Sequence, residues 1–228
     1  MICTIKAAVA GISSSEFCVR YSKDLAFRGR ISILQGMTVN FLYVLFRLIV
    51  GIQYHSVWFL SMACYYLLLG LLRLYLLLNS RNSAADEIKC YRRTAEMLFV
   101  LNVPMGGMIL LMVITDAGYT YPGYVIYLSA LYTFYTMTMA IVNLVRFRHL
   151  GSLILSAAKV LSFVATLMSL IGLQTALIDQ FSSHDGSYRM LMNALTGGGI
   201  YLTVIVTAFW MLRRSKRMMR EAKTVEPL

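Results

Sequence analysis

The chain has 228 residues, of which 59% are hydrophobic and only 14% charged. This composition excludes an ordinary soluble domain, which needs more polar surface to cover one core. The formal net charge is +11, but the basic residues lie between and after apolar blocks, as in the cytoplasmic loops of membrane proteins. No base-stacking platform or basic recognition helix accompanies them, so nucleic acid is excluded as a partner.

Residues 1–35 are predicted to form a basic cytoplasmic segment. Phe17, Tyr21 and Leu25 are spaced so that they share one helical face, and basic residues around them favour an amphipathic helix on the inner leaflet. A partly ordered tail is an equal alternative. The single early lysine, Lys6, precedes only a short apolar run, so we interpret the segment as retained rather than as a cleaved signal peptide.

Six apolar stretches follow, of about the length that crosses the hydrocarbon of a bilayer. They lie near residues 37–54, 57–78, 95–115, 123–145, 152–174 and 191–212. We therefore predict an all-α membrane protein with six transmembrane helices in one bundle. The first three helices form one half (36–115) and the last three a second half (116–212), before a basic tail (213–228).

The distribution of lysine and arginine predicts the orientation. With the N-terminus inside, the inner segments hold Lys6, Arg20, Lys23, Arg28, Arg30, Arg81, Lys89, Arg92, Arg93, Arg146, Arg148, Arg213, Arg214, Lys216, Arg217, Arg220 and Lys223. The outer links hold Arg189 alone. Because positive residues are retained on the cytoplasmic side, both ends of the chain are predicted to be cytoplasmic.

The two halves resemble each other weakly. Six residues of the third span recur at a constant offset in the sixth: Asn102, Gly106, Gly107, Ile109, Val113 and Ile114 match Asn193, Gly197, Gly198, Ile200, Val204 and Ile205. Because each half has an odd number of spans, the second half enters the membrane in the opposite sense. Inverted repeats are typical of transporters that bind solutes where the halves meet, although apolar helices also share residues by chance.

Five polar residues inside the spans are the candidate substrate-binding residues: Arg47, Asn102, Asn143, Lys159 and Asn193. A central arginine such as Arg47 costs about 2.5–3.5 kcal/mol to insert, so it should face protein or water. No acidic residue lies at its depth, which favours a small anionic solute or a lipid headgroup as ligand. The alternative is a structural arginine held by hydroxyls and carbonyls.

Two other basic residues lie nearer the inner edge of the membrane. We expect Arg73, near the inner end of the second span, to extend toward the headgroups. Lys159 either does the same or pairs with Glu96, at the inner start of the third span.

Glycines follow both asparagines of the proposed repeat. Gly106 and Gly107 follow Asn102, and Gly197, Gly198 and Gly199 follow Asn193. They mark either helix breaks, where freed backbone groups bind a solute, or close helix packing. Pro104 strengthens the first interpretation in the third span only.

No motif indicates catalysis or metal binding. The cysteines are Cys3, Cys18, Cys64 and Cys90, and neither they nor the scattered histidines have metal-ligand spacing. The spans hold no paired carboxylates, and no phosphate loop, dinucleotide fingerprint or nucleophile elbow is present. We therefore expect no enzyme, no cofactor and no metal.

Two long runs carry a family resemblance. They are FRGRISILQGMTVNFLYVLFRLIVGIQYHSVWFLSMACYYLLLGLLRLYLLL and YPGYVIYLSALYTFYTMTMAIVNLVRFRHLGSLILSAAKV, the second followed by LQTA. From about residue 27 onward the chain resembles a family of six-span membrane proteins frequent in clostridia-like Firmicutes, for which no activity is known. The resemblance implies the topology and a bacterial plasma membrane, and it assigns no functional residue.

Two hypotheses of function remain. A transporter or permease component for a small, anionic solute predicts a polar cavity between the halves that reaches Arg47, Asn102 and Asn193. A non-catalytic scaffold, regulator or subunit of a larger membrane complex predicts a solid interior and a lipid-facing groove of small residues. Its partners would be the bilayer and either further copies of the chain or another membrane protein. A channel along an oligomer axis is a third option.

Overall fold

Six helices make up the fold in the computed structural model, which describes residues 25–79, 84–115, 123–146, 152–181 and 186–225. They are α3 (Leu25–Gln53), α4 (Val57–Leu78), α5 (Ala84–Thr115), α6 (Gly123–Arg146), α7 (Leu153–Phe181) and α8 (Gly186–Val225). All six are long and apolar enough to cross a membrane, and the described residues contain no strand. The predicted all-α membrane fold with six spanning helices is confirmed.

Three helices extend well beyond the predicted apolar spans. Helix α3 begins at Leu25, α5 takes in most of the polar segment before the third span, and α8 continues through the basic tail to Val225. Charged residues with long side chains are good helix formers, so the backbone stays helical where the membrane ends. The predicted amphipathic segment falls largely on residues 1–24, which lie outside the described part.

Ion pairs within single helices support these extensions. Lys89 pairs with Asp86 at 3.3 Å in α5, and Arg217 pairs with Glu221 at 2.9 Å in α8. Each pair lies one helical turn apart, and such pairs add a few tenths of a kcal/mol to an exposed helix. Glu96 pairs with Arg92 in the same way, at 2.7 Å.

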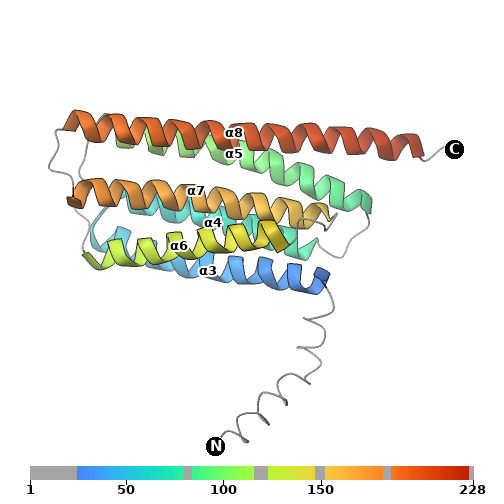
Figure 1. The fold of residues 1–228 in the computed structure, drawn as a ribbon, viewed down its shortest axis with the longest axis horizontal. Helices are drawn as coiled ribbons and strands as arrows, with labels where there is room; N and C mark the ends of the chain where they lie inside the picture. The colour runs from blue at the N-terminus through green and yellow to red at the C-terminus, as the bar shows by residue number, and fades with distance from the viewer. Residues whose placement is uncertain (1–24, 80–83, 116–122, 147–151, 182–185, 226–228) are drawn as a thin grey trace, which may run out of the picture.

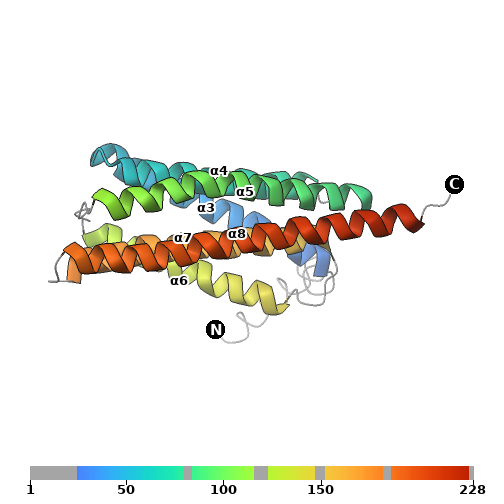
Figure 2. The same cartoon turned by 90° about the horizontal axis from the view of Figure 1, so that it is seen from above.

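The helices form two layers, each in chain order. Helices α3, α4 and α5 form one layer, and α6, α7 and α8 form the other, which lies against it (Figures 1 and 2). The most extensive backbone packing joins α3 to α4, α5 to α8, and α6 to α7. The short link at Tyr54–Ser56 turns α3 back into α4, with His55 in the left-handed region at φ 48°.

Helix α3 begins and α8 ends at the same end of the bundle (Figure 1). We call this the basic end, because nearly all described basic residues outside the bundle interior lie here. Those whose side chains the structure describes are Arg30, Lys89, Arg92, Arg93, Arg213, Arg214, Lys216, Arg217 and Arg220. Arg189 belongs to the first turn of α8, at the opposite end. The fold thus gathers the positive charge on one side, as the topology prediction requires.

Candidate functional site: a polar seam between the two layers

Arg47 lies in the last third of α3 and is completely buried. It is near the middle of the predicted span 37–54, but α3 begins earlier than the apolar pattern indicated, so Arg47 lies nearer the end of the helix. Its Nε donates to the Tyr43 hydroxyl at 2.9 Å, and its Nη2 donates to Ser129 Oγ of α6 at 3.4 Å. The guanidinium carbon lies 5.0 Å from the centroid of the Phe59 ring of α4, within range of a cation–π contact.

Gly172 of α7 packs against the side of the Arg47 guanidinium that the other contacts leave uncovered. A Cβ at this position would lie 3.2 Å from Arg47 Nη2, so a glycine lets the guanidinium lie close to the α7 backbone. Arg47 therefore contacts four helices, α3, α4, α6 and α7. Hydroxyls and aromatic rings enclose it, as expected for an arginine inside a membrane protein.

Arg47 belongs to a ladder of polar contacts that we call the α3–α6 seam. Its rungs are Ser32–Asn143 at 2.9 Å, Gln35–Tyr135 at 2.9 Å, Asn40–Tyr132 at 2.8 Å, Arg47–Ser129 at 3.4 Å and Tyr54–Tyr124 at 3.2 Å. As numbers rise along α3 they fall along α6, so the helices are antiparallel. The seam runs from the basic end to the opposite end of the bundle and joins the two predicted halves.

Tyrosine rings fill the middle of the seam. The rings of Tyr43 and Tyr132 stack with centroids 3.6 Å apart and planes 2° apart. Tyr66 of α4 meets both rings edge-on, at 5.0 Å and 5.6 Å, and edge-to-face contact is a favoured arrangement for aromatic pairs. The rings keep the α3 and α6 backbones apart, and their hydroxyls supply polar groups at membrane depth.

Hydroxyls continue the polar region from α6 to α7. Thr133 donates to the carbonyl of Ser169 at 3.2 Å, and the hydroxyls of Thr136 and Ser169 lie 3.4 Å apart. Both threonines also bond to carbonyls within α6. Together with Ser129 and Asn143 they form a buried polar face on α6, so the polar region of the seam extends to α7.

Arg73 differs from its prediction. Its side chain is only 5% exposed and points into the bundle, where Nη2 donates to Ser162 Oγ of α7 at 3.2 Å. A Cβ at Gly36 would overlap the Arg73 guanidinium, so this glycine of α3 provides the space. The direction of a side chain around its helix, rather than its depth, decides whether it can reach the headgroups.

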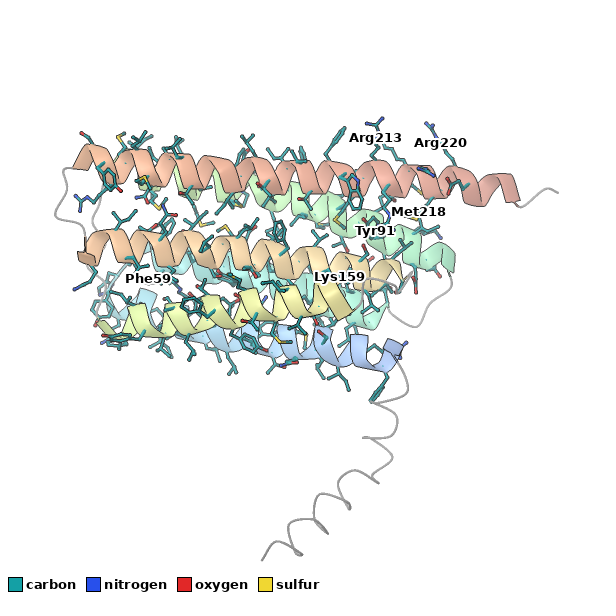
Figure 3. The ribbon with its side chains drawn as sticks, in the orientation of Figure 1. Phe59, Tyr91, Lys159, Arg213, Met218 and Arg220 are labelled. Carbon is teal, nitrogen blue, oxygen red and sulfur yellow. The ribbon has the colours of Figure 1, made fainter. Side chains whose placement is uncertain are left out.

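Arg73 lines a pocket at the basic end of the seam, which we call the basic-end pocket. Its walls come from four helices and consist of Gly29, Ser32, Ile33, Arg73, Asn143, Leu155, Ala158, Lys159 and Ser162. The cavity measures about 20 Å³, which is room for about one water molecule. Two predicted residues, Asn143 and Lys159, meet here. Figure 3 shows Lys159 in the half of the bundle opposite to Phe59, the ring that Arg47 contacts.

Asn102 and Asn193 do not join Arg47. Both are buried, but they lie on α5 and α8, which pack against each other. A Cβ at Gly106 would lie 2.8 Å from the Tyr201 ring. In this antiparallel register Asn102 is level with about residue 204, so about 17 Å of helix separates the two asparagines. Among the described residues, neither Oδ1 has a hydrogen-bond partner.

The glycines of the proposed repeat lie within unbroken helices. Helix α5 continues through Pro104, and α8 continues through the glycine triplet. A Cβ at Gly197 would lie 2.6 Å from Ile109 of α5, so Gly106 and Gly197 both let the two helices approach closely, as small residues do in membranes. Gly107, Gly198 and Gly199 have open space around them. Of the two interpretations of these glycines, close helix packing therefore agrees with the structure and a helix break does not.

Sequence reasoning missed three parts of this region: the burial of Arg73, the tyrosine rings and the polar face of α6. The last had a visible signal, because Ser129, Thr133, Thr136 and Asn143 recur at helical spacing. Among the described residues, no group of His, Cys, Asp or Glu could hold a metal ion.

The chain matches no protein-family model and no curated protein. The resemblance to the clostridial six-span proteins stays a prediction.

Proposed function

We propose that this polytopic membrane protein is a transporter or permease component for a small anionic solute. The observation that carries the proposal is the α3–α6 seam, with Arg47 within it and Arg73 and Lys159 at its basic end. The sequences of α3, α4, α6 and α7 contain one acidic residue, Asp179, near the far end of α7. Cations beside hydroxyl and amide groups can replace the water around an anion.

The arrangement of the helices supports an inverted repeat. In an inverted repeat, a pseudo-twofold axis would relate α3 to α6, α4 to α7 and α5 to α8. The contacts of one half should then recur in the other, and they do: α3–α4 corresponds to α6–α7, and α4–α5 corresponds to α7–α8. The axis would also place α3 beside α6, α4 beside α7 and α5 beside α8. The α5–α7 and α3–α7 contacts are exceptions, because their symmetry counterparts, α4–α8 and α4–α6, have at most a marginal contact. Transporters of this architecture bind solutes between the repeats.

A closed conformation explains why Arg47 is enclosed. The rungs of the seam join hydroxyl, amide and guanidinium groups, and an anion entering between α3 and α6 could take over the donors. Alternating access would then separate the two layers at one end at a time. We also propose that the basic end faces the cytoplasm of a bacterium, because arginine and lysine concentrate there.

Flux measurements test this proposal. The purified chain, reconstituted into liposomes, is expected to increase the release of at least one of chloride, phosphate or small carboxylates over protein-free liposomes. Arg47→Met fills a similar volume without the charge and should abolish that flux. Arg213→Met, at an exposed position of α8, is the matched control and should leave it unchanged. Absence of flux for every anion, or equal flux through both variants, would contradict the proposal.

A groove between α4 and α5 favours a second candidate, a non-catalytic subunit of a membrane complex. It measures about 370 Å³, and its walls include the small residues Ser61, Cys64 and Gly107. Small residues let helix backbones approach closely in lipid, so the occupant that fits is a single transmembrane helix of another protein.

Crosslinking from Cys64 tests the second candidate, because this thiol is exposed. In a chain with Cys3 and Cys18 replaced by serine, a photoreactive group on Cys64 should join one protein species in native membranes. Gly107→Phe fills the groove and should prevent the adduct. Gly198→Phe, also in open space, is the control. Lipid adducts alone would exclude a helix in this groove.

A further inference from the structure

The basic-end pocket collects hydrogen-bond donors and positive charge, and the wall residues that the structure describes include no acidic side chain. Arg73 of α4 and Lys159 of α7 contribute the two charges, and Asn143 of α6 contributes an amide. Three separate helices therefore place these groups around one small cavity. A buried cation requires a counter-charge or a full set of hydrogen bonds, because removing it from water is costly.

Two side-chain acceptors in the pocket, Ser162 Oγ and Asn143 Oδ1, already accept hydrogen bonds from within it. Ser162 Oγ accepts from Arg73 and donates to the carbonyl of Ala158 at 3.0 Å. Asn143 Oδ1 accepts a hydrogen bond from Ser32 Oγ at 2.9 Å. The amide N–H groups of Asn143 are then the part of this side chain that can bind a ligand. Within the described chain, Arg73 Nε has no hydrogen-bond partner. What the pocket offers to a ligand is therefore donors, and the complementary ligand is an oxyanion.

The size and position of the pocket narrow the ligand further. A cavity of about 20 Å³ admits one oxygen atom but not a whole tetrahedral anion. Arg73 lies about 8 Å from the end of α4 at the basic end, so the pocket is within reach of a group that enters from this end of the bundle. A phosphate group that inserts one oxygen and leaves the rest of its molecule outside fits both constraints.

We propose that the pocket formed by Arg73, Lys159 and Asn143 binds a phosphate group, either of an anionic lipid or of a soluble phosphate. Arg73 is its buried anchor, because the space at Gly36 and the bond to Ser162 fix the guanidinium at the cavity. The inference goes beyond the proposed function, since it holds whether or not the protein moves an anion across the membrane.

Two binding measurements separate the sources of phosphate. In the first, the full chain in nanodiscs that contain phosphatidylglycerol is released into a mass spectrometer, and retained lipid is counted. In the second, inorganic phosphate is titrated onto the chain in phosphatidylcholine nanodiscs. Retained phosphatidylglycerol identifies a lipid headgroup as the ligand, and saturable binding of phosphate identifies a soluble one.

Three variants and two controls locate the site. Arg73→Met and Lys159→Gln should each weaken binding about tenfold or more, whereas Arg213→Met removes the same charge from an exposed position and should not. Arg73 is buried, so Arg73→Met can disturb folding. Lys159 is partly exposed, so Lys159→Gln is expected to fold and tests the site independently. Gly36→Ala should weaken binding by displacing the Arg73 guanidinium while keeping its charge, and Gly107→Ala is its control.

The proposal is overturned if the wild-type chain binds neither ligand. It is also overturned if Lys159→Gln and Gly36→Ala bind as tightly as Arg213→Met and Gly107→Ala in the arm that shows binding.

Discussion

Single residues in this protein show how charge is accommodated inside a membrane. Arg47 has a hydroxyl acceptor on its own helix, a second on α6 and an aromatic ring on α4. Each contact is weak by itself, but together they replace part of the hydration that the guanidinium loses on burial. Glycine at position 172 keeps this space open, because a Cβ there would lie in tight contact, 3.2 Å from Arg47 Nη2.

The energetic role of Arg47 can be separated from its charge. Arg47→Ala is expected to lower the free energy of unfolding by about 2–4 kcal/mol, because it leaves a cavity and removes the partner of the buried Tyr43 hydroxyl. Arg47→Met fills most of the volume without a buried charge and should stay within about 1 kcal/mol of wild type. Unfolding by sodium dodecyl sulfate in mixed micelles measures both. If Arg47→Met lost as much free energy of unfolding as Arg47→Ala, the charge of Arg47 would itself stabilise the fold.

Helix pairs differ in what holds them together. Helices α5 and α8 approach through glycines, whereas α3 and α6 are held apart by tyrosines and joined through polar side chains. Close backbone packing gives many dispersion contacts, and separating the two helices would break all of them at once. A seam of hydrogen bonds can exchange partners one at a time. The α5–α8 pair therefore suits a fixed frame, and the α3–α6 seam suits a surface that opens.

Glycine substitutions on α8 test the fixed frame. Gly197→Val should destabilise the protein by about 1–3 kcal/mol, because its Cβ alone would approach Ile109 to 2.6 Å. The neighbouring Gly198→Val has nothing within 4 Å of its Cβ and should change stability much less. Thermal unfolding in detergent compares the two. A similar loss at both positions would attribute the effect to helix propensity rather than to packing.

The Asn40–Tyr132 rung offers a test of the seam. Tyr132→Phe keeps the stacked ring but removes the hydroxyl that donates to Asn40 Oδ1 at 2.8 Å. The expected loss is about 0.6–1 kcal/mol, as for other hydrogen bonds between membrane helices. A double-mutant cycle with Asn40→Ala should give a coupling of that size. Additive losses would show that the rung contributes nothing.

In the part of the molecule that the structure describes, a one-sided distribution of basic residues is combined with an even number of membrane-length helices. Both properties place the start of α3 and the end of α8 on the same side of the membrane (Figure 1). Green fluorescent protein fused after Leu228 should fluoresce in bacterial cells, because it folds only in the cytoplasm, and alkaline phosphatase at the same place should be inactive. The reverse pattern would invert the proposed orientation.

Hydropathy was sufficient to predict the six membrane-length helices among the described residues, because lipid imposes one length on every span. The extensions of α5 and α8 were not predictable in this way, since helix formation in water leaves no apolar signal. The site was predicted only in part. Depth can be inferred from position along a span, but Arg73 is buried because of Gly36 on another helix. Asn102 and Asn193 are matched positions of the proposed repeat, but α5 and α8 are antiparallel. Matched positions on such helices lie side by side at one level of the pair only, and the two asparagines are away from that level.

Helix α8 has 40 residues and is therefore about 60 Å long, roughly twice the thickness of the hydrocarbon layer. Its basic extension projects beyond the other helices at the end where the chain finishes (Figure 1). Because no break separates this extension from the membrane-crossing part, the helix acts as one lever. A small tilt of α8 within the bilayer would sweep its charged arm through a wider arc, where soluble molecules could sense the movement or restrain it.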